Sequence, residues 1–517
     1  MRIISFHTRH DANVSVVENN EAIVTVELER IFNERYFQSS DDPARFKIEW
    51  TEALEKVFDF IGYNKFDLGI TSWVMPSQRQ ALMDMVKCKR WKTVDHHMSH
   101  ASLGFYDSGF KKALIISYDG GGNDGVFNIY LGEGNQISLL ERKKLNLGTP
   151  YKLIATQMKE LTHGKPQLGG GHHSLSGKMM GYCALGKVNP KWENAVIRYF
   201  QYYQYPAQAL YTLGNETGLD LEEGASICTV AARDLSATVQ FCIERIVLDI
   251  IEDYLRTNSV DGIVFTGGCA LNILINTLTI EQFGLPVHVP PAPNDGGISL
   301  GSIWTLYPPA VEQNLAYKGL PLEMDLKCDY GQIGRQVSPK EVAETLCGGA
   351  IIGVARGRSE FGPRALGNRS ILCQPVSKDI KRILNDEVKY REWFRPFAPV
   401  VPQENCRDFF GKEIFSPYMS FAVSFKKELR GLFPAVEHLD GTSRIQTVRK
   451  DFNPWLHEVL VEVGRQTGYP ILLNTSFNSK GKPLLNKASI ALELLRTTSL
   501  SHVLLEDRLI EKEELHD

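Results

Sequence analysis

Short apolar segments separated by polar turns open the chain. Residues 3–6, 13–17 and 22–28 are rich in β-branched and aromatic side chains, and the sequences HTRHDA and ENNE separate them. The same order recurs at residues 113–118 and 126–132, on either side of the turn sequence DGGGNDG. Apolar runs bounded by Gly, Asn and Asp predict strands that are joined as hairpins. The repetition predicts two related α/β lobes that each begin with a hairpin.

Helical periodicity begins after residue 220. Residues 225–255 carry apolar side chains at helical spacing and predict one long helix or two. A strand predicted at 262–265 leads through a glycine turn into another helix, and a strand at 287–289 leads through Pro-Pro-Ala-Pro into a further glycine turn. This alternation of strand, turn and helix is typical of α/β proteins.

A change of composition near residues 307–340 predicts a domain boundary. Prolines are frequent there and apolar periodicity is weak, so we place the boundary near residue 335. Beyond it, strands are predicted at 350–355, 370–374, 470–473 and 502–505, and helices at 377–388, 453–466 and 487–497. A chain of 517 residues is too long for one hydrophobic core, which agrees with two domains, 1–335 and 336–517.

Composition indicates an ordinary globular protein, with 43% hydrophobic and 23% charged residues. No stretch approaches the roughly 20 apolar residues that span a membrane, and the N-terminus lacks the features of a signal peptide. The nine cysteines form no Cys-x-x-Cys pair, which argues against disulfides and a thiolate zinc site and favours a reducing compartment. The net charge of −4 does not favour nucleic-acid binding. We expect a cytoplasmic protein without membrane or nucleic-acid partners, whose oligomeric state the sequence does not indicate.

The sequence HHMSH contains a candidate metal site. His96 and His100 are four residues apart, so on a helix they share one face. The pair His97 and His100 is a second possibility, and a cluster of capping or core histidines is the alternative without a metal. Asp119 and Asp295, each at a glycine-rich turn, would complete the site at strand ends, although such aspartates are also common turn formers. Two imidazoles and two carboxylates suit Fe²⁺, Mn²⁺ or Zn²⁺.

Three glycine-rich loops follow predicted strands. The sequence TGGCALN at residues 266–272 follows a strand and opens a helix, and the other two loops contain Asp119 and Asp295. Glycine lets backbone N–H groups approach a nucleotide or phosphate closely near the start of a helix. One such loop is weak evidence, but three together favour nucleotide binding.

Residues 356–395 form a strongly basic segment, with ten Lys and Arg against five Asp and Glu. The solvated face of a helix accounts for three of the cations, Lys378, Lys381 and Arg382. Arg364, Arg369 and Arg395 instead lie among Gly, Pro, Phe and Asn, where arginines usually pair with an anion. A polyphosphate is a natural candidate for that anion.

These motifs closely resemble those of the O-carbamoyltransferase family of antibiotic biosynthesis and nodulation. In the second half of the chain, the resemblance lies in GRSEFGPRALGNRSIL at 357–372, KYREWFRPFAP at 389–399, DGTSR at 440–444 and NTSFN at 474–478. In the first half it lies in HHMSHA, SYDGGGNDG, GKMMG, TGGCALN and PAPNDGGISLG. The duplicated hairpin start also resembles the actin–hexokinase–Hsp70 superfamily, in which two hairpin loops face the phosphates of a nucleotide.

The resemblance implies two domains with separate chemistry. The larger domain is expected to have an actin-like, Hsp70-like fold similar to the tRNA threonylcarbamoyl transferase subunit, and the smaller domain a YrdC-like α/β fold. In the YrdC-like domain, carbamoyl phosphate and ATP, with Mg²⁺, would give carbamoyl-adenylate, phosphate and pyrophosphate. In the larger domain, a hydroxyl of a small-molecule acceptor would take the carbamoyl group and release AMP.

The resemblance also implies roles for individual residues. Arg364, Lys389 and Arg444 are expected to contact phosphate and carbamoyl groups, and Met419 to line that site. His10 is expected to activate the acceptor hydroxyl. The expected metal ligands are His96, His100, Asp119 and Asp295, with iron as the ion. Further nucleotide or substrate contacts are expected from Gly120, Gly121, Lys178, Gly267, Gly268, Asn272, Arg395, Asn474 and Ser476.

Departures from the family pattern lie in the first domain. The sequence GYCALG at 181–186 stands where family members tend to have GLAPYG, and Arg35 is the basic residue that follows the first hairpin. Acceptors bind in this domain, so the acceptor and the choice between O- and N-carbamoylation stay open. The alternatives are a tRNA threonylcarbamoyl transferase-like enzyme, a non-catalytic nucleotide-binding protein and a sugar kinase. The arginine-rich second domain, the complete set of motif residues and the lack of a dominant basic face argue against them.

Overall fold

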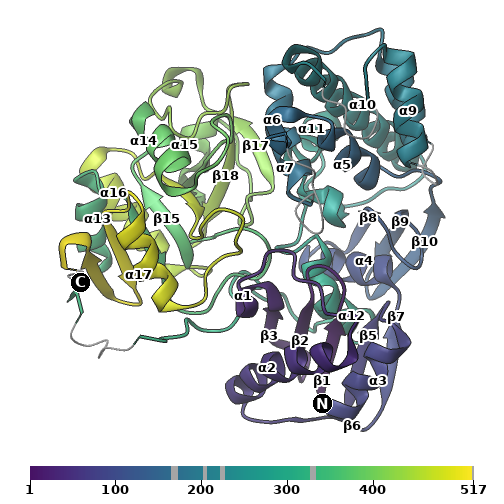
Figure 1. The fold of residues 1–517 in the computed structure, drawn as a ribbon, viewed down its shortest axis with the longest axis horizontal. Coiled ribbons are helices and arrows are strands. Elements are labelled where there is room, and N and C mark those ends of the chain that lie inside the picture. Colours follow the sequence, from purple (N-terminus) through teal and green to yellow (C-terminus); the bar gives the residue numbers. More distant parts are fainter. Residues whose placement is uncertain (165–172, 202–205, 222–226, 327–332, 515–517) are drawn as a thin grey trace. The chain divides into compact units, whose positions relative to one another are not determined.

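The computed structural model describes residues 1–164, 173–201, 206–221, 227–326 and 333–514 (Figure 1). The chain forms two compact units. The first comprises Met1–Ile23, Tyr36–Phe58 and Gly62–Gln313, and the second comprises Val24–Arg35, Asp59–Ile61 and Asn314–Asp517. The boundary expected at residue 335 falls within the second unit, because Pro321 and Glu323 form β-bridges with Arg358 and Lys487.

Two five-stranded sheets form the framework of the first unit, with the strand orders β3-β2-β1-β5-β7 and β10-β9-β8-β11-β12, although β3 from Val24 onward is assigned to the second unit. The strands of the first sheet are β1 (Arg2–His7), β2 (Asn13–Glu18), β3 (Glu21–Glu27), β5 (Leu68–Ser72) and β7 (Trp91–Val94). Those of the second are β8 (Lys112–Tyr118), β9 (Phe127–Glu133), β10 (Gln136–Arg142), β11 (Gly262–Thr266) and β12 (Val287–His288). The short strands β4 (Lys65–Phe66) and β6 (Lys87–Cys88) pair separately.

The two sheets are built in the same way. β1 pairs antiparallel with β2 and parallel with β5, and β8 pairs antiparallel with β9 and parallel with β11. β8 is buried from Ala113 to Tyr118, as its run of β-branched and aromatic residues requires. The shared strand order confirms the prediction of two related lobes that each begin with a hairpin, and the strands and helices of the first unit confirm its α/β class.

Two of the first unit's helices, α4 (His96–Asp107) and α12 (Ile298–Leu306), pack against strands of these sheets. The other helices of the unit are α2 (Pro43–Ile61), α3 (Pro76–Met85), α5 (Gly148–Thr156), α6 (Lys159–Thr162), α7 (His173–Tyr182), α8 (Glu193–Gln201), α9 (Pro206–Thr217), α10 (Thr229–Leu255) and α11 (Ile273–Phe283), while the short helix α1 (Leu28–Phe32) belongs to the second unit. α10 is one continuous helix, which decides between the one or two helices predicted there. Residues 225 and 226 of that prediction lie outside the described residues.

α4 and α12 approach each other unusually closely. A Cβ atom added to Gly301 of α12 would lie 2.0 Å from the backbone oxygen of Ser99 of α4. The hydroxyl oxygens of Ser99 and Ser302 are 2.8 Å apart and buried. Small residues therefore let the two helix backbones meet, and this contact positions the functional side chains described below.

The second unit contains a nine-stranded mixed sheet with the order β13-β21-β20-β14-β15-β19-β16-β18-β17. The strands are β13 (Arg335–Gln336), β14 (Ile352–Ala355), β15 (Arg369–Cys373), β16 (Ala398–Pro402), β17 (Phe421–Ser424), β18 (Thr442–Val448), β19 (Leu472–Ser476), β20 (His502–Leu505) and β21 (Arg508–Glu511). Its helices are α13 (Pro339–Cys347), α14 (Lys378–Ile383), α15 (Cys406–Phe410), α16 (Pro454–Thr467) and α17 (Ala488–Thr497). Leucine and valine from α13, α16 and the central strands form one buried core.

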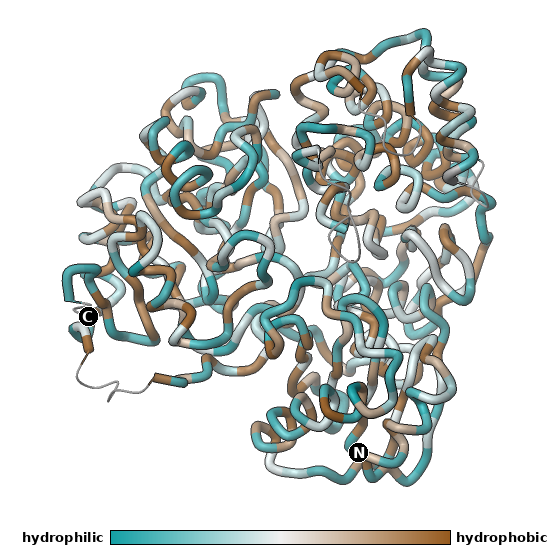
Figure 2. The backbone as a smooth tube through the Cα atoms, viewed as in Figure 1, coloured by the Kyte–Doolittle hydropathy of each residue, from teal (hydrophilic) through white to brown (hydrophobic). Residues whose placement is uncertain are grey.

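Hydrophobic stretches run along the strands and hydrophilic stretches prevail in the connecting loops (Figure 2). In the part of the chain that the structure describes, none of the helices combines the length and the apolar character needed to cross a bilayer. The alternation of strands and helices beyond residue 350 agrees with the α/β pattern predicted from the sequence.

We predict that Gly301→Ala lowers the free energy of unfolding by about 1–3 kcal/mol, because its methyl group would overlap the Ser99 carbonyl. Gly177→Ala in α7 is the matched control, since its Cβ would meet nothing within 4 Å. That variant should be about 0.5–1 kcal/mol more stable than the wild type. Thermal and urea unfolding measure both. Equal stability of Gly301→Ala and the wild type would contradict the close helix contact.

Candidate metal centre and anion-binding site

The N-terminus of α4 is tied to the loop that follows β8. The backbone N–H of His96 donates to Asn123 Oδ1 at 3.0 Å, and that of His97 donates to Asp124 Oδ1 at 2.9 Å. The glycine-rich turn predicted from DGGGNDG thus caps the helix that carries the histidine motif. This cap brings the end of β8, where Asp119 lies, next to the histidines.

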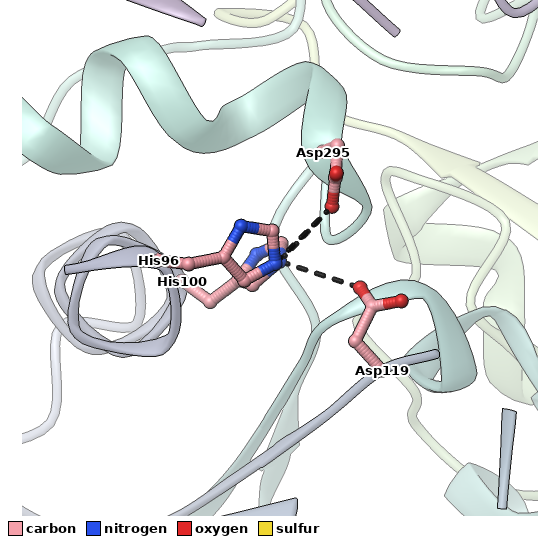
Figure 3. A group of neighbouring side chains, drawn as sticks. All are labelled: His96, His100, Asp119 and Asp295. Carbon is pink, nitrogen blue, oxygen red and sulfur yellow. Dashed lines mark ion pairs between the residues drawn. The ribbon is translucent and has the colours of Figure 1, made fainter. Parts of the chain in front are cut away.

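His96 and His100 project from one face of α4 towards two carboxylates (Figure 3). Asp119 follows β8, and Asp295 begins the short 3-10 turn before α12. Asp295 Oδ1 lies 3.5 Å from His96 Nε2 and 3.4 Å from His100 Nε2. Asp119 Oδ2 lies 3.4 Å from His100 Nε2. The structure therefore brings together all four residues that the sequence suggested as metal ligands.

The four donor groups fit a divalent cation. Ligand atoms about 2.0–2.2 Å from a shared ion lie about 3–3.6 Å apart, which matches the separations between these atoms. His96 and His100 are buried, and neither ring nitrogen of either residue has a hydrogen-bond partner within the described ranges. Asp295 Oδ1 also lacks one there. Buried polar atoms without partners are costly unless a ligand or ion satisfies them.

Electrostatics favours the metal-binding forms of His96 and Asp119 and gathers positive charge at His100. Burial lowers the pKa of His96 to about 3, so its imidazole is neutral at pH 7. Burial and Asp295 oppose ionisation of Asp119, but His100 and His96 outweigh them and lower its pKa to about 2. Burial also opposes protonation of His100, yet Asp119 and Asp295 raise its pKa to about 9. The two carboxylates thus attract positive charge to His100, as they would attract a metal ion.

His97 faces away from this group. Its Nδ1 lies 2.8 Å from Ser117 Oγ and its Nε2 lies 3.1 Å from the backbone oxygen of Gly125. Both ring nitrogens therefore have protein partners, in contrast to those of His96 and His100. Of the two histidine pairs considered from the sequence, the geometry favours His96 with His100.

His10 borders the same carboxylate from the loop between β1 and β2. Its Nε2 lies 3.4 Å from Asp295 Oδ2, its Nδ1 lies 3.3 Å from Asp11 Oδ2, and its side chain is 35% exposed. Burial opposes its charge, but Asp295 and Asp11 raise its pKa to about 10. Its ring also lies 4.8 Å from that of His173.

Sequence reasoning missed His7, the last residue of β1. Its Nε2 lies 3.4 Å from Asp295 Oδ2, and the side chain is fully buried. The spacing of His7 and His10 at a strand end was the available signal. A single histidine in an apolar strand is usually a core residue, so the pattern did not single out His7 as a functional residue.

The glycine loop after β11 supports Asp119. The backbone N–H of Gly268 donates to Asp119 Oδ2 at 2.7 Å, and the N–H of Gly120 donates to Asp119 Oδ1. Gly267 has φ +87°, and a Cβ there would lie 2.2 Å from the backbone oxygen of Tyr118. Glycine is thus required at Gly267 by a close approach to β8, whereas a Cβ on Gly121 would meet nothing within 4 Å.

Two further residues that were expected to contact the nucleotide, Asn272 and Lys178, form hydrogen bonds within the protein. Asn272 Oδ1 accepts from the N–H groups of Leu274 and Ile275 and caps α11, and its Nδ2 donates to Gln240 Oε1 at 3.0 Å. Lys178 Nζ donates to the backbone oxygen of Leu161 at 3.0 Å. Their expected nucleotide contacts stay predictions.

In the second unit, cationic side chains cluster at the positions that the sequence singled out. Burial lowers the pKa of Arg444 well below its ordinary value, and Arg364 and Arg395 lower it further. Burial likewise lowers the pKa of Arg391, with Arg395 and Arg444 adding to the effect. Glu392 lies 3.7 Å from Arg395. Several guanidinium groups therefore share one partly buried region, which is a strong attraction for a polyanion.

Lys389 lies among these cations but is held by the protein. Its Nζ donates to the backbone oxygen of Ser476 at 2.6 Å, to Ser476 Oγ at 3.1 Å and to the backbone oxygen of Asn478 at 3.0 Å, and it also contacts Asn478 Oδ1. Burial lowers its pKa well below the ordinary value, and Arg391, Arg395 and Arg35 lower it further. Lys389 and Ser476 are thus joined by hydrogen bonds next to the group of arginines.

Asn474 and Met419 shape the loop that carries Arg364. Asn474 Nδ2 donates to the backbone oxygen of Ala365 at 3.1 Å and to Gln446 Oε1 at 2.6 Å. Met419 is 2% exposed, with φ +59°, and belongs to a buried cluster with Leu366. A left-handed conformation is uncommon for such a side chain and is maintained here by the packing around it.

The side chain of Arg369 is held by the protein. It is fully buried and donates to the backbone oxygens of Asn368 and Gly357 at 3.0 Å each and to Asn486 Oδ1 at 3.2 Å. Burial lowers the pKa of Arg369 to about 10, and the carboxylates of Glu360 and Glu506 oppose that shift. The expectation that this arginine pairs with an anionic ligand stays a prediction.

We predict that the double variant His96→Ala/His100→Ala loses its bound divalent metal, because only two carboxylates remain at the site. Metal content of the purified protein, measured by inductively coupled plasma mass spectrometry, tests this. His457→Ala is the control, since His457 pairs with Glu404 in the second unit at 2.6 Å. Stoichiometric metal in the double variant would show that the ligands lie elsewhere.

Family models match both halves of the chain. The model described as carbamoyltransferase N-terminus matches residues 51–303, and the one described as carbamoyltransferase C-terminus matches residues 343–512. The candidate metal ligands lie in the first match and the cationic cluster in the second.

Similar proteins come from nodulating bacteria. The chain is 31% identical to nodulation protein NolO of Bradyrhizobium diazoefficiens, over 81% of this chain and 79% of NolO. It is 32% identical to nodulation protein NolNO of Sinorhizobium fredii over 81% of this chain, but spans only 64% of the length of NolNO. Nodulation protein U of Sinorhizobium fredii is 28% identical, over 95% of this chain and 96% of that protein.

Among solved structures, full-length HypF in its phosphate- and nucleotide-bound form shows 14% identity and a TM-score of 0.37, over 59% of this chain and 55% of HypF. That TM-score is too low to support an inference. The two family matches and the identity with NolO over most of both chains are sufficient by themselves. The chain belongs to the carbamoyltransferase family.

Proposed function

We propose that the protein is an ATP-dependent O-carbamoyltransferase that transfers the carbamoyl group of carbamoyl phosphate to a hydroxyl of a small-molecule natural product. The observation that carries this proposal is the group of guanidiniums around Arg364, Arg395 and Arg444 in the second unit. Like charges that depress one another's pKa are stable together only if an anion compensates them. ATP and carbamoyl phosphate are both polyanions.

The first step of the proposed reaction forms carbamoyl-adenylate in the second unit. Hydrolysis of carbamoyl phosphate leaves carbamate and phosphate, and a carbamate oxygen then attacks the α-phosphorus of ATP and displaces pyrophosphate. Charge accumulates on the transferring phosphoryl group, and preorganised guanidiniums such as Arg364 and Arg444 would stabilise it. Magnesium would accompany ATP as its usual counter-ion.

The second step transfers the carbamoyl group in the first unit. The acceptor hydroxyl attacks the carbamoyl carbon, its proton passes to a base, and AMP leaves. His10 is the proposed base, because it lies at the edge of the metal cluster and is partly exposed. A cation bound to Asp295 would offset the negative charge that raises the pKa of His10 to about 10, and would so favour the neutral imidazole that a base requires. A divalent ion at His96, His100, Asp119 and Asp295, with Fe²⁺ the first choice, would supply Lewis-acid stabilisation of the departing phosphate.

We predict that Arg364→Ala slows carbamoyl-phosphate-dependent pyrophosphate release by about 10²–10³, the loss that follows removal of one charge-stabilising donor. Arg407→Ala is the matched control, because Arg407 is 72% exposed and pairs with the equally exposed Glu413. That control should retain the wild-type rate. A rate for Arg364→Ala within a few-fold of the wild type would place the adenylation site elsewhere.

We predict that His10→Ala slows carbamoyl transfer by about 10²–10⁴ and spares pyrophosphate release, because a base acts only in the second step. Pyrophosphate release measures the first step. Consumption of preformed carbamoyl-adenylate, with a panel of hydroxyl compounds, measures the second. An equal loss in both steps would contradict the assignment of His10 as the base.

A further inference from the structure

His7 is buried in a position where histidine is costly. It ends β1, the middle strand of the first sheet, and none of its side chain is exposed. Within the described part of the chain, neither of its ring nitrogens has a hydrogen-bond partner. An apolar residue would fill this core position without the loss of two hydrogen bonds to water. Packing alone therefore does not explain why a histidine occupies this position.

The Asp295 carboxylate is the polar group within reach of His7. His7 Nε2 lies 3.4 Å from Asp295 Oδ2, whereas His96 and His100 face Oδ1 of the same carboxylate. This distance is slightly longer than an ordinary N–H···O hydrogen bond of about 2.7–3.2 Å, and a small rotation of either side chain shortens it. The two oxygens of Asp295 thus have separate sets of partners.

The residue paired with His7 across the hairpin also holds Asp295. His7 and Asn13 are directly opposite each other in the pairing of β1 with β2. Asn13 Nδ2 donates to the backbone oxygen of Asp295 at 2.8 Å, and Asn13 Oδ1 accepts from the Ser299 N–H at 3.1 Å. One residue of the pair therefore fixes the backbone at Asp295, and the other faces its side chain.

His10 shares Oδ2 with His7 but differs from it in access. The His10 side chain is 35% exposed, whereas that of His7 is 0% exposed. A small-molecule acceptor can approach His10 only, so a direct role of His7 with substrate is excluded. His7 can therefore affect the site only through its contact with Asp295.

We infer that His7 is a positioning residue, whose Nε2–H donates to Oδ2 of Asp295 and keeps Oδ1 directed at the metal site of His96 and His100. The inference rests on the metal centre of the proposed function and adds to it a residue outside the ligand set. Hydrogen bonds that orient ligands in this way commonly contribute 10–100-fold to metal affinity.

The test compares two substitutions of His7 in the full chain. His7→Leu keeps the apolar volume and removes the donor, whereas His7→Gln places an amide N–H where the imidazole Nε2–H was. Dissociation constants for Mn²⁺ and for Zn²⁺ are measured by competition with a chelator, and melting temperatures are measured on metal-free protein. His288→Leu is the control, because it breaks a histidine–aspartate pair with Asp107 in the same unit.

The inference predicts that His7→Leu weakens metal binding about 10–100-fold, while His7→Gln stays within about three-fold of the wild type. Metal-free His7→Leu should melt lower than the wild type, because the buried Oδ2 of Asp295 loses one of its two imidazole partners, and His7→Gln should melt close to the wild type. Unchanged affinity in His7→Leu, or equal losses in both variants, would overturn the role. A wild type that binds neither metal would overturn the metal centre itself, while pyrophosphate release would still report on the adenylation step.

Discussion

The buried carboxylate of Asp295 is the group on which the first unit's site depends. His96 and His100 face one of its oxygens, and His7 and His10 face the other. A buried carboxylate is stable only where positive charge or hydrogen bonds compensate it, and removing one partner of such a group is costly. Its position in turn depends on packing, because the close contact of α12 with α4 at Gly301 sets how near the carboxylate can come to the histidines. The position of the charged site therefore depends on the small residues that let α4 and α12 pack closely.

In the second unit the buried charges are positive, and they too need compensation by groups of opposite charge. Burial and mutual repulsion lower the pKa of Arg391 and of Arg444, which means that the folded chain holds positive charge where water cannot screen it. Lys389 is fixed to the turn of Ser476 and Asn478, so it stiffens the wall of this region. The first unit thus offers carboxylates and imidazoles to a cation, and the second offers guanidiniums to anions. Two chemical steps with different charge requirements fit such a division.

Local patterns in the sequence predicted the parts of this arrangement that depend on local physics. Apolar runs between Gly, Asn and Asp turns gave the paired hairpins, and the spacing of His96 and His100 placed both on one face of α4. The strand β10 escaped prediction. Five of its seven residues are exposed, and its sequence, QISLLER, has no regular alternation of apolar and polar residues. His7 escaped because its partner comes from a distant part of the chain. The surroundings of Arg369 also escaped prediction, because backbone carbonyls of its own turn, which no residue pattern reveals, accept hydrogen bonds from its guanidinium.

Isotope exchange between pyrophosphate and ATP tests whether the second unit joins carbamate to AMP, as we propose. Wild-type, metal-loaded protein is incubated with ATP, Mg²⁺ and labelled pyrophosphate, with and without carbamoyl phosphate and without any acceptor. The account predicts label in ATP only when carbamoyl phosphate is present, because reversal of adenylation requires carbamoyl-adenylate on the protein. No exchange in folded protein, or exchange that is independent of carbamoyl phosphate, would contradict it.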